Sequence, residues 1–429
     1  MAIKVCDAIM GSGKSSAAIN YMNSHPEKKF IYITPYLDEA DRIKRSCPDL
    51  NFKEPNGNLP EFGFRKYNHT VELMTNGENI TSTHNMFLRY SDEMIELIKD
   101  RRYILIIDEA VDMMRQSSIS TSDLKLLERV GWTTSDDGGV GIKPDEEYDG
   151  GMLDEIITIS RGNRIIDMPC MKKGASLLYW IYSKEILEAF TEVIILTYLF
   201  SSQVMKYYFD IVNINFEYIG IERGPGGEYL FSNQTLYLPE YTATLSRKIH
   251  IFDNNKLNSI GNYTHALSQA WFERSGKDYD RKKEILKNNV YNFFTHYHGD
   301  KPASKRLWAT YKIGEKAIRG NGFTRRNIAF NTKATNDYKD KQVLAYCVNI
   351  FMRPNEKIYY AQHGVDYKED EYALSVMVQW IWRSAIRDGK EIWIYIPSQR
   401  MRTLLKDWIA SVEKKYRDNM RQGGERNGK

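Results

Sequence analysis

A short glycine-containing segment near the start of the chain constrains the fold more than any other feature. The segment Ala8-Ile-Met-Gly-Ser-Gly-Lys-Ser15 directly follows an apolar run, Ile3–Cys6, and precedes a helix-like stretch, Ser16–Asn23. This is the pattern of a phosphate-binding loop between a strand and a helix, with Ala8 in the place of the first glycine. Small residues let the backbone curl so that successive N–H groups face an anion. We therefore expect an α/β fold with a polyphosphate site at this loop.

The residues of this loop have distinct predicted tasks. Lys14 would neutralise the β- and γ-phosphates of a nucleoside triphosphate, and the Ser15 hydroxyl would complete the coordination of Mg²⁺. The sequence thus predicts ATP and Mg²⁺ as cofactors. The predicted nucleotide-binding residues are Gly11, Ser12, Gly13, Lys14, Ser15 and Ser16.

A pair of carboxylates follows a second apolar run. Tyr103–Ile107 is a candidate buried strand, and it leads into Asp108 and Glu109. The carboxyl ends of parallel strands form the edge at which α/β sheets bind ligands. Asp108 would hold Mg²⁺ together with Ser15, and Glu109 would polarise the attacking water. Because Glu109 is a candidate base for water, the pair favours hydrolysis over phosphoryl transfer to a small molecule.

Composition excludes several classes of protein. The 429 residues carry 60 Lys and Arg against 56 Asp and Glu, a net charge of +4, which argues against a polybasic binder but allows a local basic groove. The four cysteines form no CxxC pair, so we expect neither a disulfide framework nor a clustered zinc site. The longest apolar run, residues 193–200, is too short to span a bilayer, which takes about 20 residues. We expect an intracellular protein without a membrane partner.

Apolar runs alternate with amphipathic stretches along most of the chain, as in a parallel sheet built from βαβ units. The glycines of Gly220–Gln234 mark the best domain boundary. We predict two lobes, 1–232 and 233–412, with an insertion at 117–151 and a basic flexible tail at 413–429. The candidate strands are Ile3–Cys6, Phe30–Ile33, Tyr103–Ile107, Val193–Leu196, Leu307–Tyr311, Arg326–Phe330 and Ile392–Ile396. The candidate helices include Tyr90–Lys99, Gln203–Phe209, Asp280–Phe294, Glu371–Arg387 and Met401–Glu413.

A polar stripe lies on one predicted helix of the second lobe. Gln379, Arg383 and Arg387 recur at intervals of four within Glu371–Arg387, so their side chains would share one face. An ordinary amphipathic helix with solvated arginines is the simple interpretation. With a nucleotide site in the other lobe, an arginine that reaches the γ-phosphate becomes the better one. Either Arg383 or Arg387 could be that arginine.

The order of these segments resembles the motif series of superfamily 2 helicases, and more narrowly the small helicases encoded by bacteriophages. The specific matches are Gly11–Ser15 with motif I, Asp108–Val111 with the DEAD/DEAH-box motif, and Gln379–Arg387 with motif VI. Weaker matches follow in the expected order. They are Tyr32–Tyr36 with motif Ia, Ile80–His84 with the next segment, Ile194–Tyr198 with motif III, Arg306–Lys312 with motif IV and Asn331–Asn336 with motif V.

The chain departs from this motif series at several points. Motif III has Tyr198 where a small residue is usual, the arginines of motif VI are four rather than three apart, and motif V lacks its Gly-x-Asp ending. Because the phosphate loop begins so near Met1, we expect no base-reading segment before it. We therefore expect base selectivity to be weak, or to come from residues that the motifs do not identify.

The resemblance implies an ATP-dependent helicase or translocase with two RecA-like lobes of the P-loop NTPase fold and an ATP-binding cleft between them. Asp108, Glu109, Gln379, Arg383 and Arg387 would be its catalytic residues, and hydrolysis would move the lobes along a strand. DNA, single-stranded or branched, is the implied partner, with RNA left open and replication proteins as further partners. Phage replication or recombination, in the cytoplasm of a bacterial host cell, is the implied setting.

Hydroxyl and basic side chains near the predicted strand ends are candidates for contacts with a nucleic-acid backbone. For any single threonine, a cap on a loop is an equal alternative. Because the sequence contains no recognisable base-reading module, the contacts would be to phosphates. The candidates are Thr34, Pro35, Thr83, His84, Thr310, Lys333, Thr335 and Asn336.

Two other functions would use a similar motor. A DNA-packaging ATPase that carries a nuclease should have a spaced carboxylate cluster in the second half of the sequence, and none stands out there. A nucleic-acid-stimulated ATPase that remodels complexes without unwinding would have the same motifs. The sequence leaves this second alternative open.

Overall fold

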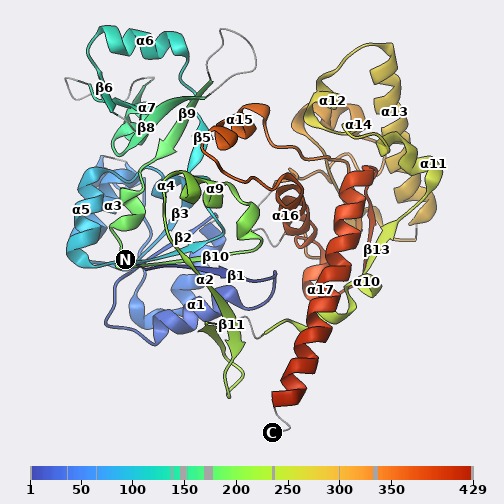
Figure 1. Cartoon of the computed structure of the whole chain (residues 1–429), viewed down its shortest axis with the longest axis horizontal. Helices are drawn as coiled ribbons and strands as arrows, with labels where there is room; N and C mark the ends of the chain where they lie inside the picture. The colour runs from blue at the N-terminus through green and yellow to red at the C-terminus, as the bar shows by residue number, and fades with distance from the viewer. Residues whose placement is uncertain are drawn as a thin grey trace. The chain divides into compact units, whose positions relative to one another are not determined.

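The computed structural model describes residues 2–35, 37–63, 65–136, 139–144, 151, 153–168, 177–233, 237–298, 300–331 and 337–426. The chain forms two compact units (Figure 1). Unit 1 comprises Met1–Ile9, Gly13–Tyr237 and Met352–Tyr367, and unit 2 comprises Met10–Ser12, Leu238–Phe351 and Lys368–Lys429. Beyond residue 13, the chain therefore leaves one unit for the other after Tyr237, after Phe351 and after Tyr367.

Seven strands form the main sheet of unit 1, in the spatial order β12-β11-β1-β10-β4-β2-β3. Neighbouring strands are parallel, except for the antiparallel pair β11 and β12. The strand that leads into the phosphate loop, β1, thus has β10 and β4 on one side and the β11–β12 pair on the other. The strands are β1 Ala2–Asp7, β2 Phe30–Thr34, β3 Ile80–Thr83, β4 Ile104–Asp108, β10 Glu192–Thr197, β11 Glu217–Arg223 and β12 Tyr229–Ser232.

The central strands of this sheet are largely apolar, and most of their residues are buried. Every residue of β2 is buried, as is usual for a parallel strand inside an α/β fold. On one face, Ala17 and Met22 of α1 and Ile43 of α2 pack against side chains of β1, β2, β4 and β10. The predicted α/β fold is confirmed. The helices of unit 1 outside its insertion include α1 Lys14–Asn23, α2 Leu37–Ser46, α3 Lys66–Thr75, α4 His84–Phe87, α5 Asp92–Arg101, α8 Glu185–Glu188 and α9 Val204–Ile211.

A second, antiparallel sheet of five strands is inserted into unit 1 between β4 and β10 (Figure 1, cyan to green). Its spatial order is β5-β9-β8-β7-β6. The predicted insertion, 117–151, covers only the first part of it, because the sequence analysis recognised the polar, glycine-rich segment and not the apolar strands that follow. The elements are β5 Met114–Gln116, α6 Thr121–Arg129, β6 Thr133–Asp136, β7 Gly139–Ile142, α7 Asp154–Ser160, β8 Asn163–Met168 and β9 Leu177–Tyr182.

The glycines around residue 225 form a hairpin rather than a linker. Gly224 donates its N–H to the carbonyl of Glu228, and Gly227 donates to the carbonyl of Gly224, both at 2.9 Å. Gly227 has a φ of +82°, which glycine adopts without strain. The turn therefore joins β11 to β12 within one sheet, and the boundary between the units lies further on, after Tyr237.

The sheet of unit 2 has four parallel strands in the order β13-β16-β15-β14. The predicted strand Arg326–Phe330 is wrong, because this segment follows a turn and makes only an isolated bridge from Asn327 to Trp308. The strands are β13 Ile249–Phe252, β14 Arg306–Ala309, β15 Val343–Tyr346 and β16 Ile392–Tyr395. The helices include α10 Leu245–Lys248, α11 Asn255–Asn258, α12 Gln269–Glu273, α13 Lys277–Asn292, α14 Glu315–Ile318, α16 Glu369–Ile381 and α17 Gln399–Arg426.

Two helix ends differ from the sequence-based expectation. The predicted helix Glu371–Arg387 stops early, since α16 ends at Ile381 and a short 3₁₀ helix, Ala385–Asp388, follows a turn. At that turn, the Ser384 hydroxyl donates to the carbonyl of Ile381 at 2.6 Å, which satisfies a carbonyl at the helix end. The second difference is the end of α17. This helix runs through position 413, where we expect the flexible tail to begin, and continues to Arg426.

One helix of unit 1 comes from the second half of the chain. Helix α15, Pro354–Gln362, lies beside the inserted sheet (Figure 1). The Tyr179 hydroxyl donates to Glu356 at 3.3 Å, and Arg353 donates to the side chain of Gln116 at 3.2 Å. The ring of Tyr360 also contacts that of Tyr207, with 5.1 Å between their centroids. The segment Met352–Tyr367 is therefore an integral part of unit 1.

Within the described ranges, no helix is both long and apolar enough to cross a membrane. The cysteines at positions 6, 47 and 347 are buried free thiols, and Cys170 lies outside the described residues.

Candidate functional site

The phosphate loop has the backbone that its glycines predict. It joins β1 to α1, and Gly11 and Gly13 have φ angles of +73° and +91°. These left-handed conformations strain residues that have a Cβ, which explains the Gly-x-Gly spacing. Helix α1 begins at Lys14 without a side-chain cap and without an acidic residue in its first turn. Its first N–H groups are therefore not capped by the side chain of Gly13 or by an acidic residue of the first turn, and they are suited to a ligand anion.

Two side chains of the loop fit a bound phosphate. The Lys14 ammonium donates to the carbonyls of Ala8 and Ile9, at 2.5 and 3.2 Å, and no described carboxylate forms an ion pair with it. The Ser12 side chain is 1% exposed, and its hydroxyl has no hydrogen-bond partner among the residues that the structure describes. A buried hydroxyl without a partner costs about 1–3 kcal/mol. A ligand oxygen would satisfy it, so the loop fits the triphosphate that the sequence predicts.

The predicted carboxylate pair lies at the carboxyl end of β4. Burial raises the pKa of Asp108 to about 7, and the charges of Glu109 and Glu39 act in the same direction. Lys14 and the Tyr32 hydroxyl partly oppose this shift. Because β1 and β4 are parallel and are separated only by β10, the phosphate loop and the Asp-Glu pair follow strands that end at the same edge of the sheet. Among the described residues, no cluster of three metal-ligating side chains is present, so Mg²⁺ would depend on Asp108, Ser15 and the phosphates themselves.

Glu109 has an unusual backbone conformation. Its φ is +64°, a left-handed value that is uncommon for any residue with a Cβ. Its N–H donates to the carbonyl of Leu196 in β10 at 2.9 Å, and this bond holds the residue in place. Strain of this kind persists where the surrounding structure enforces it, and it clusters at functional sites.

The sequence analysis missed two residues that fix the end of β10. The carboxylate of Asp7 accepts hydrogen bonds from the N–H groups of Leu199 and Phe200, at 2.8 and 3.0 Å. The side chain of Gln203 donates to the Thr197 hydroxyl at 2.8 Å. Asp7 could have been found from its place between the first strand and the loop. Gln203 belongs to no sequence pattern that would have identified it.

Some of the residues predicted to contact nucleic acid are buried, and others are partly exposed. Thr34 and Thr310 are buried, and the Thr310 hydroxyl donates to the carbonyl of Cys347 at 3.2 Å, so neither is on a surface that a strand could reach in this conformation. Pro35 and Thr83 are partly exposed, and the Thr83 hydroxyl also caps α4 by accepting from the N–H of Met86. The candidates at 333, 335 and 336 (Lys333, Thr335 and Asn336) lie outside the described residues.

His84 has a structural partner. Its Nε2 lies 2.9 Å from the carbonyl oxygen of Asp108. Because a carbonyl only accepts, this nitrogen must carry the proton and donate. The side chain is thus part of the Asp-Glu site as well as a candidate for nucleic-acid contact.

The three polar residues matched with motif VI in the sequence do not share one helical face. Gln379 is partly buried in the last turn of α16, Arg383 lies in the turn after it, and Arg387 lies in the 3₁₀ helix. The predicted stripe is wrong because the helix ends at Ile381. Arg383 is only 7% exposed, whereas Arg387 is exposed and forms no ion pair with any described residue.

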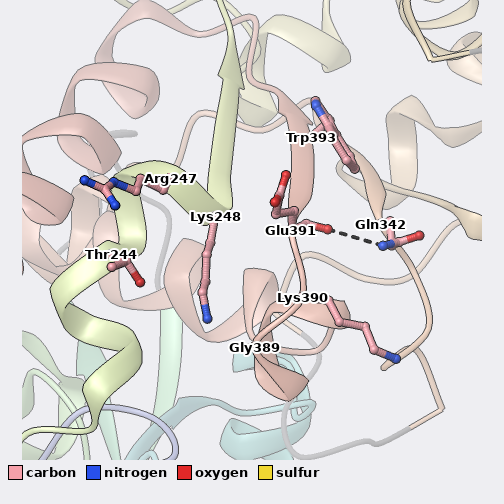
Figure 2. A pocket seen from close by; sticks show the side chains of 8 residues that line it. All are labelled: Thr244, Arg247, Lys248, Gln342, Gly389, Lys390, Glu391 and Trp393. Carbon is pink, nitrogen blue, oxygen red and sulfur yellow. Dashed lines mark hydrogen bonds between the residues drawn. The ribbon is translucent and has the colours of Figure 1, made fainter.

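A cationic concavity of about 660 Å³ lies beside this 3₁₀ helix, at the amino ends of β13 and β16 in unit 2 (Figure 2). Within the described ranges, neither Lys248 nor Lys390 is in an ion pair, and the Lys248 ammonium lies next to Gly389. No sequence pattern predicts this concavity, because the residues that line it are far apart in the chain. Its lining residues are Thr244, Arg247, Lys248, Gln342, Gly389, Lys390, Glu391 and Trp393.

Comparison with known proteins gives one close relative and several more distant structures. Residues 243–409 match the family model described as the YonV C-terminal Rossmann-like domain. The chain is 35% identical over 416 residues to the SPbeta prophage-derived uncharacterized protein YonV of Bacillus subtilis (strain 168), covering 95% of this chain and 99% of that one.

Similar solved structures include one titled XPD_Helicase and the structure of S. tokodaii Xpd4. Their TM-scores are 0.49 and 0.47 and their identities 11% and 12%; each comparison covers 95% of this chain and 94% of the other. The identity and coverage of the Bacillus relative decide the family: the chain belongs to the family of the prophage protein YonV.

Proposed function

We propose that this protein hydrolyses ATP and uses the energy to move along nucleic acid, as a DNA helicase or translocase. One observation carries the proposal. The phosphate loop, with Lys14, and the Asp108–Glu109 pair lie at the carboxyl ends of β1 and β4, two parallel strands separated only by β10. Nucleotide hydrolysis requires groups that bind the phosphates, a carboxylate that binds the metal ion and a base for the attacking water, and these residues would supply all three.

The proposed roles of the chain's own groups in unit 1 follow from their chemistry. The N–H groups at the start of α1 and the Lys14 ammonium would bind the phosphates, with the Ser12 hydroxyl as a further donor. Asp108 and Ser15 would hold Mg²⁺, which neutralises the charge that develops on the phosphates. Glu109 would accept a proton from the attacking water, and the backbone bond to Leu196 would hold it in position.

In unit 2, we assign the role of the γ-phosphate arginine to Arg387 rather than Arg383. The assignment rests on exposure, since Arg387 is on the surface and Arg383 is buried in the turn. Lys248 and Lys390 lie in the concavity beside the 3₁₀ helix that contains Arg387. They would add to the positive electrostatic potential around this arginine. Gln379, in the last turn of α16, would be a further catalytic residue of unit 2.

For the nucleic-acid partner, we favour the carboxyl ends of β2 and β3. Thr34 and Thr83 are opposite one another in the register of these strands, and the partly exposed Pro35 and Thr83 lie at the resulting edge. The prophage origin of the Bacillus relative favours a role in phage DNA metabolism inside a bacterial cell.

The test measures ATP hydrolysis, strand displacement and translocation by the full-length protein, on DNA and on RNA of defined polarity. We expect hydrolysis that nucleic acid stimulates and that Lys14→Ala abolishes. Translocation without strand displacement would instead favour a remodelling ATPase. Absence of ATP hydrolysis with every nucleic acid would overturn the proposal.

A further inference from the structure

An aromatic ring from the β11–β12 hairpin lies directly on the phosphate loop. A Cβ atom placed on Gly13 would overlap the ring of Tyr229, so the ring occupies the space that a side chain would need. The carbonyl of Tyr229 accepts a hydrogen bond from Asn20 of α1 at 2.9 Å. This bond ties the hairpin to the helix that begins at the loop, and so fixes the ring relative to Gly13.

Tyr229 is part of a small cluster of flat groups. Arg223 is directly opposite it in the hairpin register, and the guanidinium lies 4.8 Å from the Tyr229 ring centroid and 5.5 Å from that of Tyr237. The two tyrosine rings meet edge to face, with centroids 5.7 Å apart. Arg223 is exposed and is in no ion pair with a described residue, while both tyrosines are partly exposed. The cluster is thus partly exposed to solvent next to the loop, although both rings also pack against the core of unit 1.

The strand order indicates which end of a nucleotide would reach this cluster. Asp108 belongs to β4, which is two strands from β1 on the β10 side, whereas the hairpin is on the opposite side of β1. If the terminal phosphates and Mg²⁺ lie toward Asp108, the phosphate chain crosses the loop. The sugar and base then extend toward β11 and β12, where Tyr229 lies.

We propose that Tyr229, with Arg223 and Tyr237, forms the platform on which the base of the bound nucleotide stacks. This inference rests on the proposed function, because it assumes that the loop binds a nucleoside triphosphate. Aromatic rings and guanidinium planes stack on every base, since each base has a π-face. The platform therefore prefers purines over pyrimidines by ring area and discriminates little between adenine and guanine.

The test compares ATP with tripolyphosphate, which has the phosphates but no base. Binding of each to the full-length protein is measured by calorimetry with Mg²⁺ present. Loss of one stacking contact costs an ATP ligand about 5- to 160-fold in affinity. We expect Tyr229→Ala to lose ATP affinity in this range and to keep its affinity for tripolyphosphate. Tyr229→Phe should bind both ligands like the natural protein.

Two further variants keep the inference testable if Tyr229→Ala does not fold. In Tyr229→Trp, ATP should quench the new indole fluorescence, whereas tripolyphosphate should not. Arg223→Ala should weaken ATP binding selectively, while the matched control Arg281→Ala, at an exposed arginine of α13, should not.

The outcomes separate this inference from the proposed function. Equal ATP affinity in Tyr229→Ala, or an equal loss for ATP and tripolyphosphate, would show that the ring only packs against the loop and would overturn the platform. Lys14→Ala addresses the loop itself, and it should lose both ligands. If Lys14→Ala kept both, the loop would not be the phosphate site and the proposed function would fail.

Discussion

The Nε2 of His84 donates a hydrogen bond to the carbonyl oxygen of Asp108 at 2.9 Å, so the start of α4 is joined to the end of β4. The adjacent Thr83 is a partly exposed candidate for contact with nucleic acid, and Asp108 is the proposed Mg²⁺ ligand. A nucleic-acid strand that displaces α4 would therefore act, through the His84 side chain, on the backbone of the residue that is the proposed metal ligand. This makes His84 a positioning residue for the proposed hydrolysis.

Replacement of His84 by alanine should weaken hydrolysis and leave ATP binding intact. A single neutral hydrogen bond is worth about 0.5–1.5 kcal/mol, which corresponds to a loss of about 2- to 12-fold in turnover. The matched control is His25→Ala, since His25, just after the end of α1, also bonds a backbone carbonyl, that of Tyr21. If His84→Ala lost nucleic-acid affinity at an unchanged basal rate, His84 would be a nucleic-acid contact instead.

The raised pKa of Asp108 predicts a pH dependence of Mg²⁺-nucleotide binding. The nucleotide-free carboxyl has a pKa of about 7, and the metal requires the ionised form. Affinity should therefore increase as the pH rises toward about 7 and level off above it, and binding at lower pH should release a proton. Calorimetry in buffers of different ionisation enthalpy measures this release. Asp108→Asn should abolish it, and release of a full proton by that variant would refute the assignment.

The same carboxyl should make the nucleotide-free protein less stable as the pH rises. In the unfolded chain an aspartate ionises near pH 3.8, so between about pH 4 and about pH 7 the folded state holds a proton that the unfolded state has lost. The free energy of unfolding contributed by this group then decreases across that interval. Urea unfolding at several pH values measures it, and Asp108→Asn should flatten the decrease. An identical pH profile for the variant would contradict the expectation.

Glu109→Gln should separate ATP binding from hydrolysis. The amide keeps the size and the backbone position of the side chain but cannot accept the proton from water. General-base catalysis contributes about 10²- to 10⁴-fold, so turnover should drop by that factor while the affinity for ATP and Mg²⁺ persists. Glu93→Gln, at an exposed position in the first turn of α5, is the matched control. Normal turnover in Glu109→Gln would remove this carboxylate from the mechanism.

The two arginines of motif VI should give different phenotypes. Arg387→Ala should fold normally, bind ATP and lose nucleic-acid-stimulated turnover by about 10³- to 10⁵-fold, the usual contribution of an arginine at a γ-phosphate. Arg383→Ala should chiefly lower the melting temperature, because that side chain is buried. Arg281→Ala again provides the exposed control. Normal turnover in Arg387→Ala with a large loss in Arg383→Ala would exchange their roles.

The sequence was most informative where local chemistry alone decides the structure. The loop from Ala8 to Ser15 follows from its glycines, and the buried strands follow from apolar runs such as Phe30–Ile33. The Asp108 and Glu109 pair follows from its place at the end of such a run. Each of these features depends on residues that are adjacent in the chain, so no knowledge of distant contacts was needed.

Prediction failed where a distant partner or a single capping bond decides the outcome. Helical periodicity continues through Arg387, yet the helix ends at Ile381, where Ser384 bonds its carbonyl. The glycines of residues 224–227 suit a linker and a tight hairpin equally, and only the pairing of β11 with β12 distinguishes them. The contact of Tyr229 with Gly13 joins positions 216 apart, and no local pattern predicts it.

The segment Met352–Tyr367 affects how the protein can be synthesised and folded. Unit 1 contains α15, which leaves the ribosome only after most of unit 2 has been made. An isolated amino-terminal fragment would leave the α15-facing sides of Tyr179 and Tyr207 without their partners. Domains usually fold as units and in order of synthesis. Here the first unit cannot be completed before its last helix emerges, so its folding must wait until Leu238–Phe351 of the second unit has been synthesised.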